Sequence, residues 1–331
     1  MSHDGTLESL YGTGAAVATD EHVFWHQFQD RTIYRTHRST GHTDALSLNH
    51  AARVGPVLGC GRLGVHTNAG LIWVDIDSWE VVGKTPTASP HTGTLMDELL
   101  VYIPGIDGGL QSYSVDSGDQ RWAVESNRVI TGISSSKEAV YLVDANSEGG
   151  EVVAIEKSSG NVRWRTDVVG ETYTTPVLGT HVFVRDNSGV LHALRKDTGE
   201  RVWRTQSKTT DPYTVPAYRD ETVYVPDEKT GTVTALHATT GEQVWRTQIP
   251  TGDERKERAT TLSAPLCTPD SVLVGASPGG LVVLSAETGD KRWQDTTDAF
   301  DSNLVATGDS IYGLTTDGIV EATPFPESQD D

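Results

Sequence analysis

Apolar residues along the chain come in short runs of three to six, which Gly, Asp, Thr and Pro interrupt. Runs of this length are typical of short β-strands, whereas a helix needs a longer pattern with a period near 3.6. Many runs occur in pairs around a Gly-containing turn, which predicts β-hairpins. Eight first strands of such hairpins are predicted, at His22–Trp25, Leu63–Val65, Leu99–Tyr102, Val140–Val143, Val182–Val184, Val223–Val225, Val272–Val274 and Ile311–Leu314.

A tail motif follows most of these hairpins. It reads KDTGERVWRT up to Thr205 and ATTGEQVWRT up to Thr247, and a Gly stands four residues before each Trp. Gly83 and Ala45 occupy the Trp position in two degenerate copies. The remaining copies, spaced 42, 39, 42 and 48 residues apart, carry Trp122, Trp164, Trp203, Trp245 and Trp293. A period of about 41 residues is typical of one four-stranded propeller blade.

The repeated residues have structural explanations. A Trp at the same position of every repeat is predicted to pack between neighbouring blades, where its N–H donates to a carbonyl. Small residues at Ala154, Ala193 and Ala235 would let adjacent sheets approach each other. In the first repeats, where the motif has no Trp, Trp73 and Trp79 lie outside the regular position and are expected to replace the missing Trp contacts.

The predicted fold is therefore all-β: one domain over residues 1–331, an eight-bladed β-propeller of four-stranded antiparallel blades. The eighth hairpin has no tail motif after it, so we expect residues 1–12 to supply the strand that closes the ring and covers the sheet edge. Residues 327–331 are predicted to be a disordered tail. Seven blades with an additional hairpin is the alternative count.

The chain is strongly acidic, with a formal charge of −20. It contains 27 Asp and 19 Glu but only 8 Lys and 18 Arg, a bias that resembles proteins of salt-loving archaea. Such a surface repels itself in dilute buffer and is screened at high salt. Nucleic acid and anionic membranes are accordingly predicted to be poor partners.

The N-terminal residues MSHDGTLESLYG show neither a basic region nor an apolar core, and no later segment has a membrane-spanning length. These features predict a cytoplasmic protein without membrane insertion. Cys60 and Cys267 are the only cysteines, so no disulfide framework is expected.

The pattern of paired apolar strands, Ala-Leu, Thr-Gly-Glu and Val-Trp-Arg resembles the PQQ-like repeat family over nearly the whole chain. That resemblance implies either a quinoprotein dehydrogenase, with pyrroloquinoline quinone and calcium in a central funnel, or a non-enzymatic protein-binding propeller similar to the outer-membrane assembly lipoprotein. Fold alone does not choose between the two.

The sequence contains few residues in the patterns expected of an enzyme. The adjacent cysteine pair typical of quinoprotein dehydrogenases is missing, and Glu171, Asp301 and Asn303 are isolated candidates for calcium ligands. His22 and His26 lack further zinc ligands at suitable spacing. We therefore predict no catalytic residue, no metal and no cofactor, and a protein that is not an enzyme.

A protein partner is the predicted ligand, bound by a monomeric propeller at one rim. Tyr and Arg residues anchor many interfaces, and several of them precede the prolines at which inner strands begin. A basic insertion in the widest repeat interval adds cations that would attract an acidic partner. The candidate partner-binding residues are Arg53, Tyr173, Tyr213, Arg255, Lys256 and Arg258. A degenerate quinoprotein-type oxidoreductase and a small-ligand sensor, each with its site in the central channel, are the alternatives.

Overall fold

The computed structural model describes most of the 331 residues. The described ranges are 17–26, 31–52, 56–59, 61–85, 95–96, 100–104, 109–115, 117–126, 128–146, 149–168, 174–205, 214–249, 261–277, 279–296, 304–307, 310–315 and 318–322. The predicted closing strand at residues 1–12 and the predicted tail at 327–331 lie outside these ranges. Throughout the described ranges the regular structure is β-strand.

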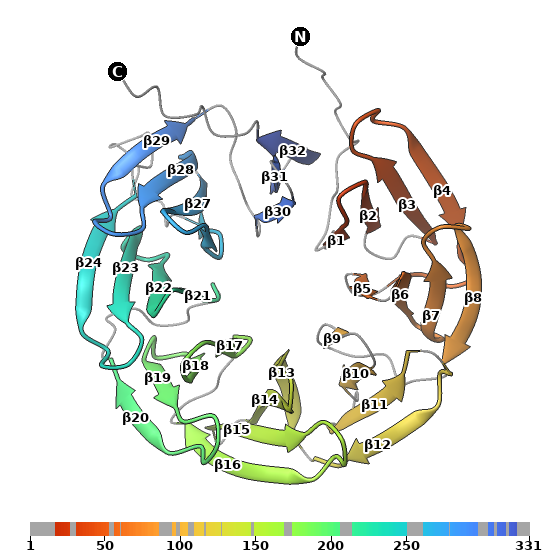
Figure 1. Ribbon diagram of the computed structural model, residues 1–331, viewed down its shortest axis with the longest axis horizontal. Coiled ribbons are helices and arrows are strands. Elements are labelled where there is room, and N and C mark those ends of the chain that lie inside the picture. Colours follow the sequence, from red (N-terminus) through yellow and green to blue (C-terminus); the bar gives the residue numbers. More distant parts are fainter. Residues whose placement is uncertain are drawn as a thin grey trace. The chain divides into compact units, whose positions relative to one another are not determined.

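Six sheets are antiparallel and four-stranded, with strands in chain order, and we number them blades 1 to 6 (Figure 1). Blade 1 contains β1 (Val17–Ala18), β2 (His22–His26), β3 (Thr32–His37) and β4 (Thr43–Ser47). Blade 2 contains β5 (Val57–Gly59), β6 (Arg62–Thr67), β7 (Gly70–Asp75) and β8 (Glu80–Thr85). Blade 3 contains β9 (Leu95–Met96), β10 (Leu100–Pro104), β11 (Leu110–Ser114) and β12 (Gln120–Val124).

The other blades follow the same order along the chain. Blade 4 contains β13 (Val129–Ser135), β14 (Ala139–Asn146), β15 (Gly149–Glu156) and β16 (Val162–Val168). Blade 5 contains β17 (Val177–Leu178), β18 (Val182–Arg185), β19 (Leu191–Leu194) and β20 (Arg201–Arg204). Blade 6 contains β21 (Ala217–Arg219), β22 (Thr222–Asp227), β23 (Thr232–His237) and β24 (Gln243–Gln248).

Two further sheets depart from the four-stranded pattern. A five-stranded sheet contains β25 (Thr261–Leu262), β26 (Leu266–Cys267), β27 (Ser271–Ser277), β28 (Gly280–Ser285) and β29 (Lys291–Asp295). A three-stranded sheet contains β30 (Val305–Thr307), β31 (Ser310–Thr315) and β32 (Gly318–Ala322). All eight predicted hairpins overlap the strand pairs that begin with β2, β6, β10, β14, β18, β22, β27 and β31.

The predicted number of blades is wrong, because the structure has six four-stranded blades and not eight. In the five-stranded sheet the innermost strand is split: β25 pairs with one end of β27 and β26 with the other. Pro265 lies between the two pieces and has no N–H to donate. There the Ser263 hydroxyl accepts from the Gly275 N–H in place of a backbone group. The three-stranded sheet has no fourth strand among the described residues.

The described strands group into two compact units, one built on Tyr11–Val215 with His237–Glu242 and the other on Pro216–Leu236 with Gln243–Asp331. That residues 1–331 form a single domain stays a prediction. Within each unit, hydrophobic clusters join strands of consecutive sheets, as Trp164 of blade 4 does with Val182 and Leu194 of blade 5. The described ranges include no helix long and apolar enough to cross a membrane.

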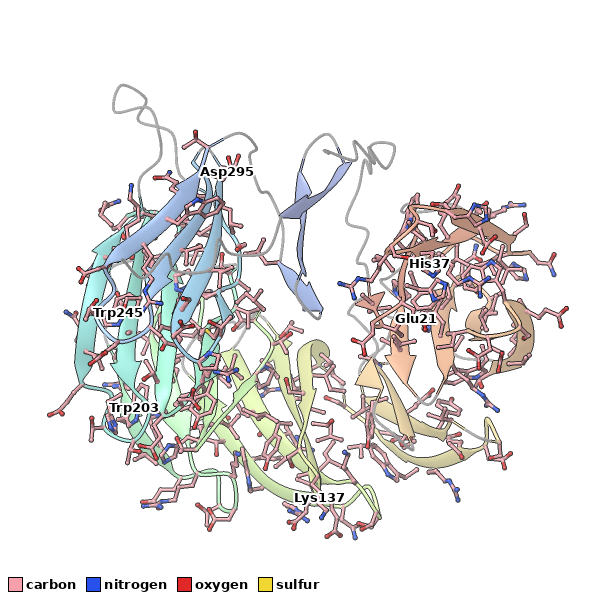
Figure 2. The ribbon with its side chains drawn as sticks, turned by 45° about the horizontal axis from the view of Figure 1, so that its top comes forward. Glu21, His37, Lys137, Trp203, Trp245 and Asp295 are labelled. Carbon is pink, nitrogen blue, oxygen red and sulfur yellow. The ribbon has the colours of Figure 1, made fainter. Side chains whose placement is uncertain are left out.

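The tail Trp residues contact the turn that precedes the next outer strand. Each indole N–H donates, at 2.8 or 2.9 Å, to the carbonyl three residues before that turn's Gly. The four donor and acceptor pairs are Trp122 with Lys157, Trp164 with Lys196, Trp203 with Ala238 and Trp245 with Ala286. The outer strands that carry Trp203 and Trp245 are visible in Figure 2.

The turn Gly lies against the indole of the preceding tail. A Cβ placed on Gly241 would lie 2.8 Å from the Trp203 ring, and one on Gly289 would lie 2.5 Å from Trp245. Both glycines have φ of +75°, a conformation that L side chains resist. Two constraints therefore keep Gly at this position of the motif: the turn needs a positive φ, and the Trp ring of the preceding tail leaves no space for a Cβ.

Between blades 1 and 2 the same contact is made by other residue types, with an Arg as the hydrogen-bond donor and a Trp at the turn. Trp79 occupies the turn position with φ of 55°, and Gly83 occupies the Trp position. The Arg35 guanidinium of blade 1 lies 4.8 Å from the Trp79 ring centroid and donates to the Ile76 carbonyl at 2.7 Å. Arg35 thus supplies the N–H that an indole supplies elsewhere, and the ring comes from the following blade. In blade 2, Trp73 is buried and donates to Thr85 Oγ1 at 3.0 Å.

The contact between turn and indole can be tested with two glycines. We expect Gly241→Ala to destabilise the protein more than Gly41→Ala, which has φ of +70° but nothing within 4 Å of its Cβ. Both variants incur the left-handed penalty of about 1–2 kcal/mol, and only Gly241→Ala adds overpacking, about 1–3 kcal/mol. Urea denaturation of the two variants measures the difference; equal losses would contradict the packing role.

Candidate functional site

The predicted partner-binding residues cannot be placed, because all of them lie outside the described residues. These are Arg53, Tyr173, Tyr213, Arg255, Lys256 and Arg258. Among the tail residues, four Trp side chains contact the following turn as described above, while Trp293 on β29 is 38% exposed. The alternatives Glu171, Asp301 and Asn303 also lie outside the described ranges.

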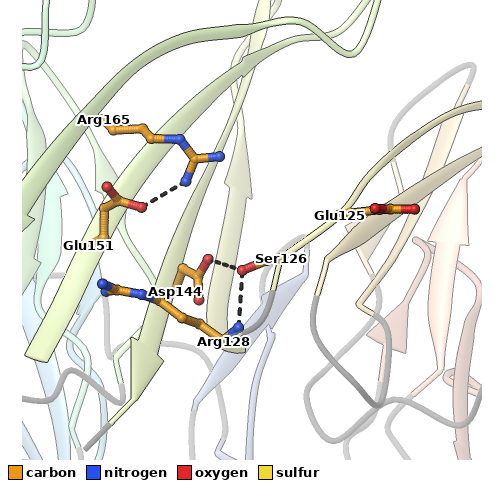
Figure 3. A pocket seen from close by; sticks show the side chains of 6 residues that line it. All are labelled: Glu125, Ser126, Arg128, Asp144, Glu151 and Arg165. Carbon is orange, nitrogen blue, oxygen red and sulfur yellow. Dashed lines mark hydrogen bonds and ion pairs between the residues drawn. The ribbon is translucent and has the colours of Figure 1, made fainter. Parts of the chain in front are cut away.

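An open pocket of about 420 Å³ lies where blade 3 leads into blade 4 (Figure 3). Glu125 and Ser126 follow β12, and Arg128 immediately precedes β13. The side chains of the next three strands complete the lining, which consists of Glu125, Ser126, Arg128, Asp144, Glu151 and Arg165. We call this the junction pocket. Neither the motif nor the hydrophobic pattern indicated it.

Asp144 is the most enclosed residue of the junction pocket, with an exposure of 1%. Its Oδ2 accepts from the Ser126 hydroxyl at 2.5 Å, and Ser126 Oγ in turn accepts from the Arg128 backbone N–H at 3.1 Å. Its Oδ1 is buried without a hydrogen-bond partner. Burial raises the pKa of the Asp144 carboxyl, and the Ser126 hydrogen bond and the Arg128 charge oppose that rise.

The adjacent charges are partly paired. Glu151 lies directly opposite Asp144 in the β14–β15 register, so the two carboxylates lie on neighbouring strands. Arg165 Nη1 donates to Glu151 Oε2 at 2.7 Å, which neutralises that acid. The lining as a whole has three acids and two guanidiniums, a formal charge of −1 when all are ionised.

Equivalent acids in the next two blades are bonded differently. Asp186 and Asp227 stand three residues after an aromatic residue, as Asp144 does after Tyr141. Asp186 Oδ1 accepts from two backbone N–H groups of its own hairpin, and its Oδ2 contacts His192 Nε2 at 2.9 Å. Asp227 Oδ1 accepts from the Thr230 N–H. This recurrence is the sequence signal that would have marked Asp144 together with Asp186 and Asp227.

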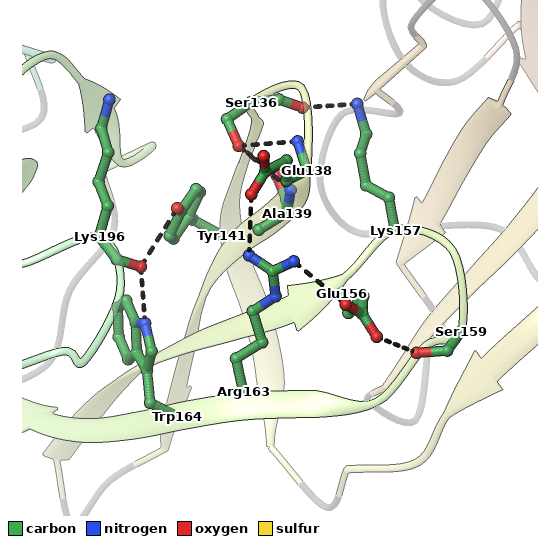
Figure 4. A network of polar contacts seen from close by, with 10 residues as sticks. All are labelled: Ser136, Glu138, Ala139, Tyr141, Glu156, Lys157, Ser159, Arg163, Trp164 and Lys196. Atoms are coloured by element: carbon green, nitrogen blue, oxygen red, sulfur yellow. Dashed lines mark hydrogen bonds and ion pairs between the residues drawn. The ribbon is translucent and has the colours of Figure 1, made fainter.

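Polar contacts on the other face of blade 4 support the fold. Figure 4 shows Trp164 Nε1 and the Tyr141 hydroxyl both directed at the Lys196 carbonyl, at 2.9 and 3.4 Å. Arg163 lies 3.6 Å from a Glu138 oxygen and 3.2 Å from a Glu156 oxygen, and these groups are partly exposed. Exposed pairs of this kind contribute little free energy, and those of Arg163 lie within blade 4, so we assign only the contacts of Trp164 and Tyr141 with Lys196 to blade docking.

The described residues show little reactive chemistry. They contain no group of three or more His, Cys, Asp or Glu side chains arranged to hold a metal ion. Burial raises the pKa of the Cys267 thiol to about 12, so that it stays protonated. In the junction pocket the Ser126 hydroxyl donates to the Asp144 carboxylate and accepts from the Arg128 backbone N–H, so both of these interactions are made within the chain.

A family model described as outer membrane protein assembly factor BamB matches residues 106–324, about two thirds of the chain. The chain belongs to this family. The match confirms the PQQ-like repeat predicted from the tail motif.

Two curated BamB assembly factors match shorter segments of the chain. The protein of Alkalilimnicola ehrlichii is 25% identical over 151 residues, which is 41% of this chain and 38% of that protein. The protein of Nitrosomonas eutropha is 29% identical over 123 residues, which is 37% of this chain and 29% of that protein. The match thus spans about a third of the length of these relatives.

Solved structures support the propeller fold. BamB from Moraxella catarrhalis has a TM-score of 0.69 at 17% identity, covering 96% of this chain and 100% of that one. The computationally designed Ika8 protein has a TM-score of 0.79 at 14% identity, covering 96% and 99%. A europium-containing methanol dehydrogenase has a TM-score of 0.67 at 12% identity, covering 91% and 83%. At these identities the similarity concerns fold alone.

The buried carboxyl predicts a pH-dependent effect. A raised pKa in the folded state means that the stability present below the usual value of 3.8 is lost as Asp144 ionises at higher pH. We therefore expect Asp144→Asn to melt at a higher temperature than the wild type at pH 7, with the difference shrinking toward pH 4. Thermal melts at fixed salt measure it. A difference that stays constant across this range would contradict the assignment.

Proposed function

We propose that this protein is a non-catalytic scaffold that binds a protein partner. The observation that carries the proposal is the family: the matching model and both curated relatives are described as assembly factors for outer membrane proteins. A protein that assists assembly must contact other polypeptides. Docked blades provide a rigid surface for this purpose, because an ordered interface loses less conformational entropy on binding.

The site chemistry agrees with binding better than with catalysis. The junction pocket is open, polar and charged, whereas small-molecule sites are usually more enclosed and apolar. We propose that the partner contacts a rim of the propeller, with the predicted anchors Arg53, Tyr173, Tyr213, Arg255, Lys256 and Arg258. A monomeric state and a cytoplasmic location are parts of the same proposal.

The second candidate is an oxidoreductase or small-ligand sensor with its site in the central channel. Its support is the fold that this chain shares with the methanol dehydrogenase. The two candidates differ in what they bind. A scaffold retains a protein at fixed stoichiometry, whereas the alternative binds pyrroloquinoline quinone saturably and needs no protein.

Affinity capture from the organism that encodes the protein, at that organism's intracellular salt, tests the proposal. We expect a stoichiometric protein partner with the wild type and at least about tenfold less of it when Tyr213 and Arg255 are both replaced by Ala, since Tyr and Arg anchors often contribute 2 kcal/mol or more. Arg195→Ala is the matched control, because Arg195 is exposed and forms an ion pair with the exposed Glu200. Calorimetry with pyrroloquinoline quinone and calcium should show no heat of binding.

Two results would overturn the scaffold proposal. One is saturable quinone binding with no captured protein. The other is a captured protein whose amount falls equally in Arg195→Ala and in the double variant, because that pattern indicates non-specific electrostatic retention.

A further inference from the structure

The carbonyl that docks the outer turn of blade 5 onto blade 4 has two side-chain donors. Lys196 O accepts from Trp164 Nε1 at 2.9 Å and from the Tyr141 hydroxyl at 3.4 Å. The rings of Tyr141 and Trp164 lie 5.9 Å apart. A phenol ionises near pH 10, and burial raises the pKa of Tyr141 further. Both donors therefore keep their protons at neutral and at acidic pH.

Blade 5 makes the corresponding contact with a different second donor. Phe183 occupies the position of Tyr141, with its ring 5.7 Å from that of Trp203, and it has no hydroxyl. His181, two residues earlier in the chain, hydrogen-bonds instead to the backbone of Ala238. The Ala238 carbonyl also accepts from Trp203 Nε1 at 2.9 Å. A titratable imidazole thus stands where blade 4 uses a phenol.

The other ring nitrogen of His181 is enclosed. The residue is 9% exposed and its ring lies edge-on to Phe183, with the centroids 6.0 Å apart. Nδ1 is buried without a hydrogen-bond partner, so Nε2 makes the bond to Ala238. The neutral ring therefore has its N–H at Nε2 and a lone pair at Nδ1. A second proton can go only to Nδ1, where it would be a buried donor without an acceptor.

The surroundings of the ring oppose a positive charge. Burial lowers the pKa of His181, the hydrogen bond to Ala238 opposes that effect, and the charges of Arg195 and Lys196 lower the pKa further. The turn over 237–242 belongs to the same compact unit as blade 5. Because the pKa in the folded state is below the ordinary 6.5, the stability from this contact is present above pH 6.5 and is lost as the pH falls.

We propose that His181 makes the docking of the turn over 237–242 onto blade 5 dependent on pH. At neutral pH the uncharged ring holds the turn through Ala238. In acid the turn opens, Nδ1 takes a proton from solvent, and the imidazolium remains hydrated outside its enclosed position. The docking contact of blade 4 lacks this response, because its second donor is Tyr141. The inference goes beyond the proposed scaffold function and does not depend on it.

Amide hydrogen exchange of the full chain at pH 8 and pH 5, at fixed salt, tests the inference. The Gly241 amide donates to the His237 carbonyl and reports on the docked turn, while the Gly160 amide reports on the equivalent turn that contacts Trp122. We expect the protection factor of Gly241 to fall severalfold from pH 8 to pH 5 and that of Gly160 to stay unchanged. In nitrogen NMR of the wild type, the fall should follow protonation of His181 Nδ1.

Two variants remove the titration in different ways. His181→Gln keeps a side-chain N–H donor that does not titrate. The double variant His181→Ala with Phe183→Tyr copies Ala139 and Tyr141 of blade 4 into blade 5. We expect both variants to protect the Gly241 amide equally at pH 8 and pH 5.

The docked turn has titratable residues of its own, His237 and Glu242, which provide the matched controls. We expect His237→Gln and Glu242→Gln to lose Gly241 protection in acid as the wild type does. Melting temperatures at pH 8 show that each variant folds.

Three results would overturn the inference. One is equal Gly241 protection at both pH values in the wild type, whether or not His181 Nδ1 is protonated. Another is an equal fall at Gly241 and Gly160, which indicates general acid destabilisation. The third is a fall that persists in His181→Gln and in the double variant, or that disappears in His237→Gln or Glu242→Gln, because it assigns the response to another group.

Discussion

The fold depends on one repeated contact, in which a side-chain N–H captures the carbonyl three residues before the outer turn of the next sheet. Tail Trp residues do this from blades 3 to 6, while Arg35 and Arg62 do it at Ile76 and Val115 in the first two blades. A single hydrogen bond of this kind contributes about 1 kcal/mol. In blades 3 to 6 the Trp ring packs against the turn Gly as well, so that the hydrogen bond and the ring together position the turn against the preceding sheet.

Much of this arrangement could be predicted from the sequence, because a repeated motif reports the same environment several times. Trp203 and Gly241 recur at fixed spacing because one packs on the other. The contact between blades 1 and 2 was harder to predict from the sequence, because Arg35 replaces the tail Trp as the hydrogen-bond donor and Trp79 replaces the turn Gly. The predicted number of blades was wrong for another reason. A hairpin pattern does not indicate how many further strands pair with the hairpin, and at Pro265 the innermost strand is divided into β25 and β26.

The candidate site was less predictable than the fold. Asp144 looks like one of many acids in a chain with 46 of them, and only the structure shows that its carboxylate leaves its own hairpin for Ser126. The pocket that results combines residues from the end of blade 3 and three strands of blade 4. Such a combination is specified by how blade 3 leads into blade 4 and is not contained in any single repeat.

Hydrogen exchange in Trp203→Ala tests the central claim most directly. The turn over 237–242 is closed by backbone hydrogen bonds from the His237 and Gly241 N–H groups, and Trp203 contacts this turn through Ala238 and Gly241. If indole capture holds each turn in place, exchange at these two amides accelerates while the equivalent Gly199 amide, whose turn contacts Trp164, stays protected. Unchanged exchange at His237 and Gly241, or an equal increase at all three amides, would contradict the account.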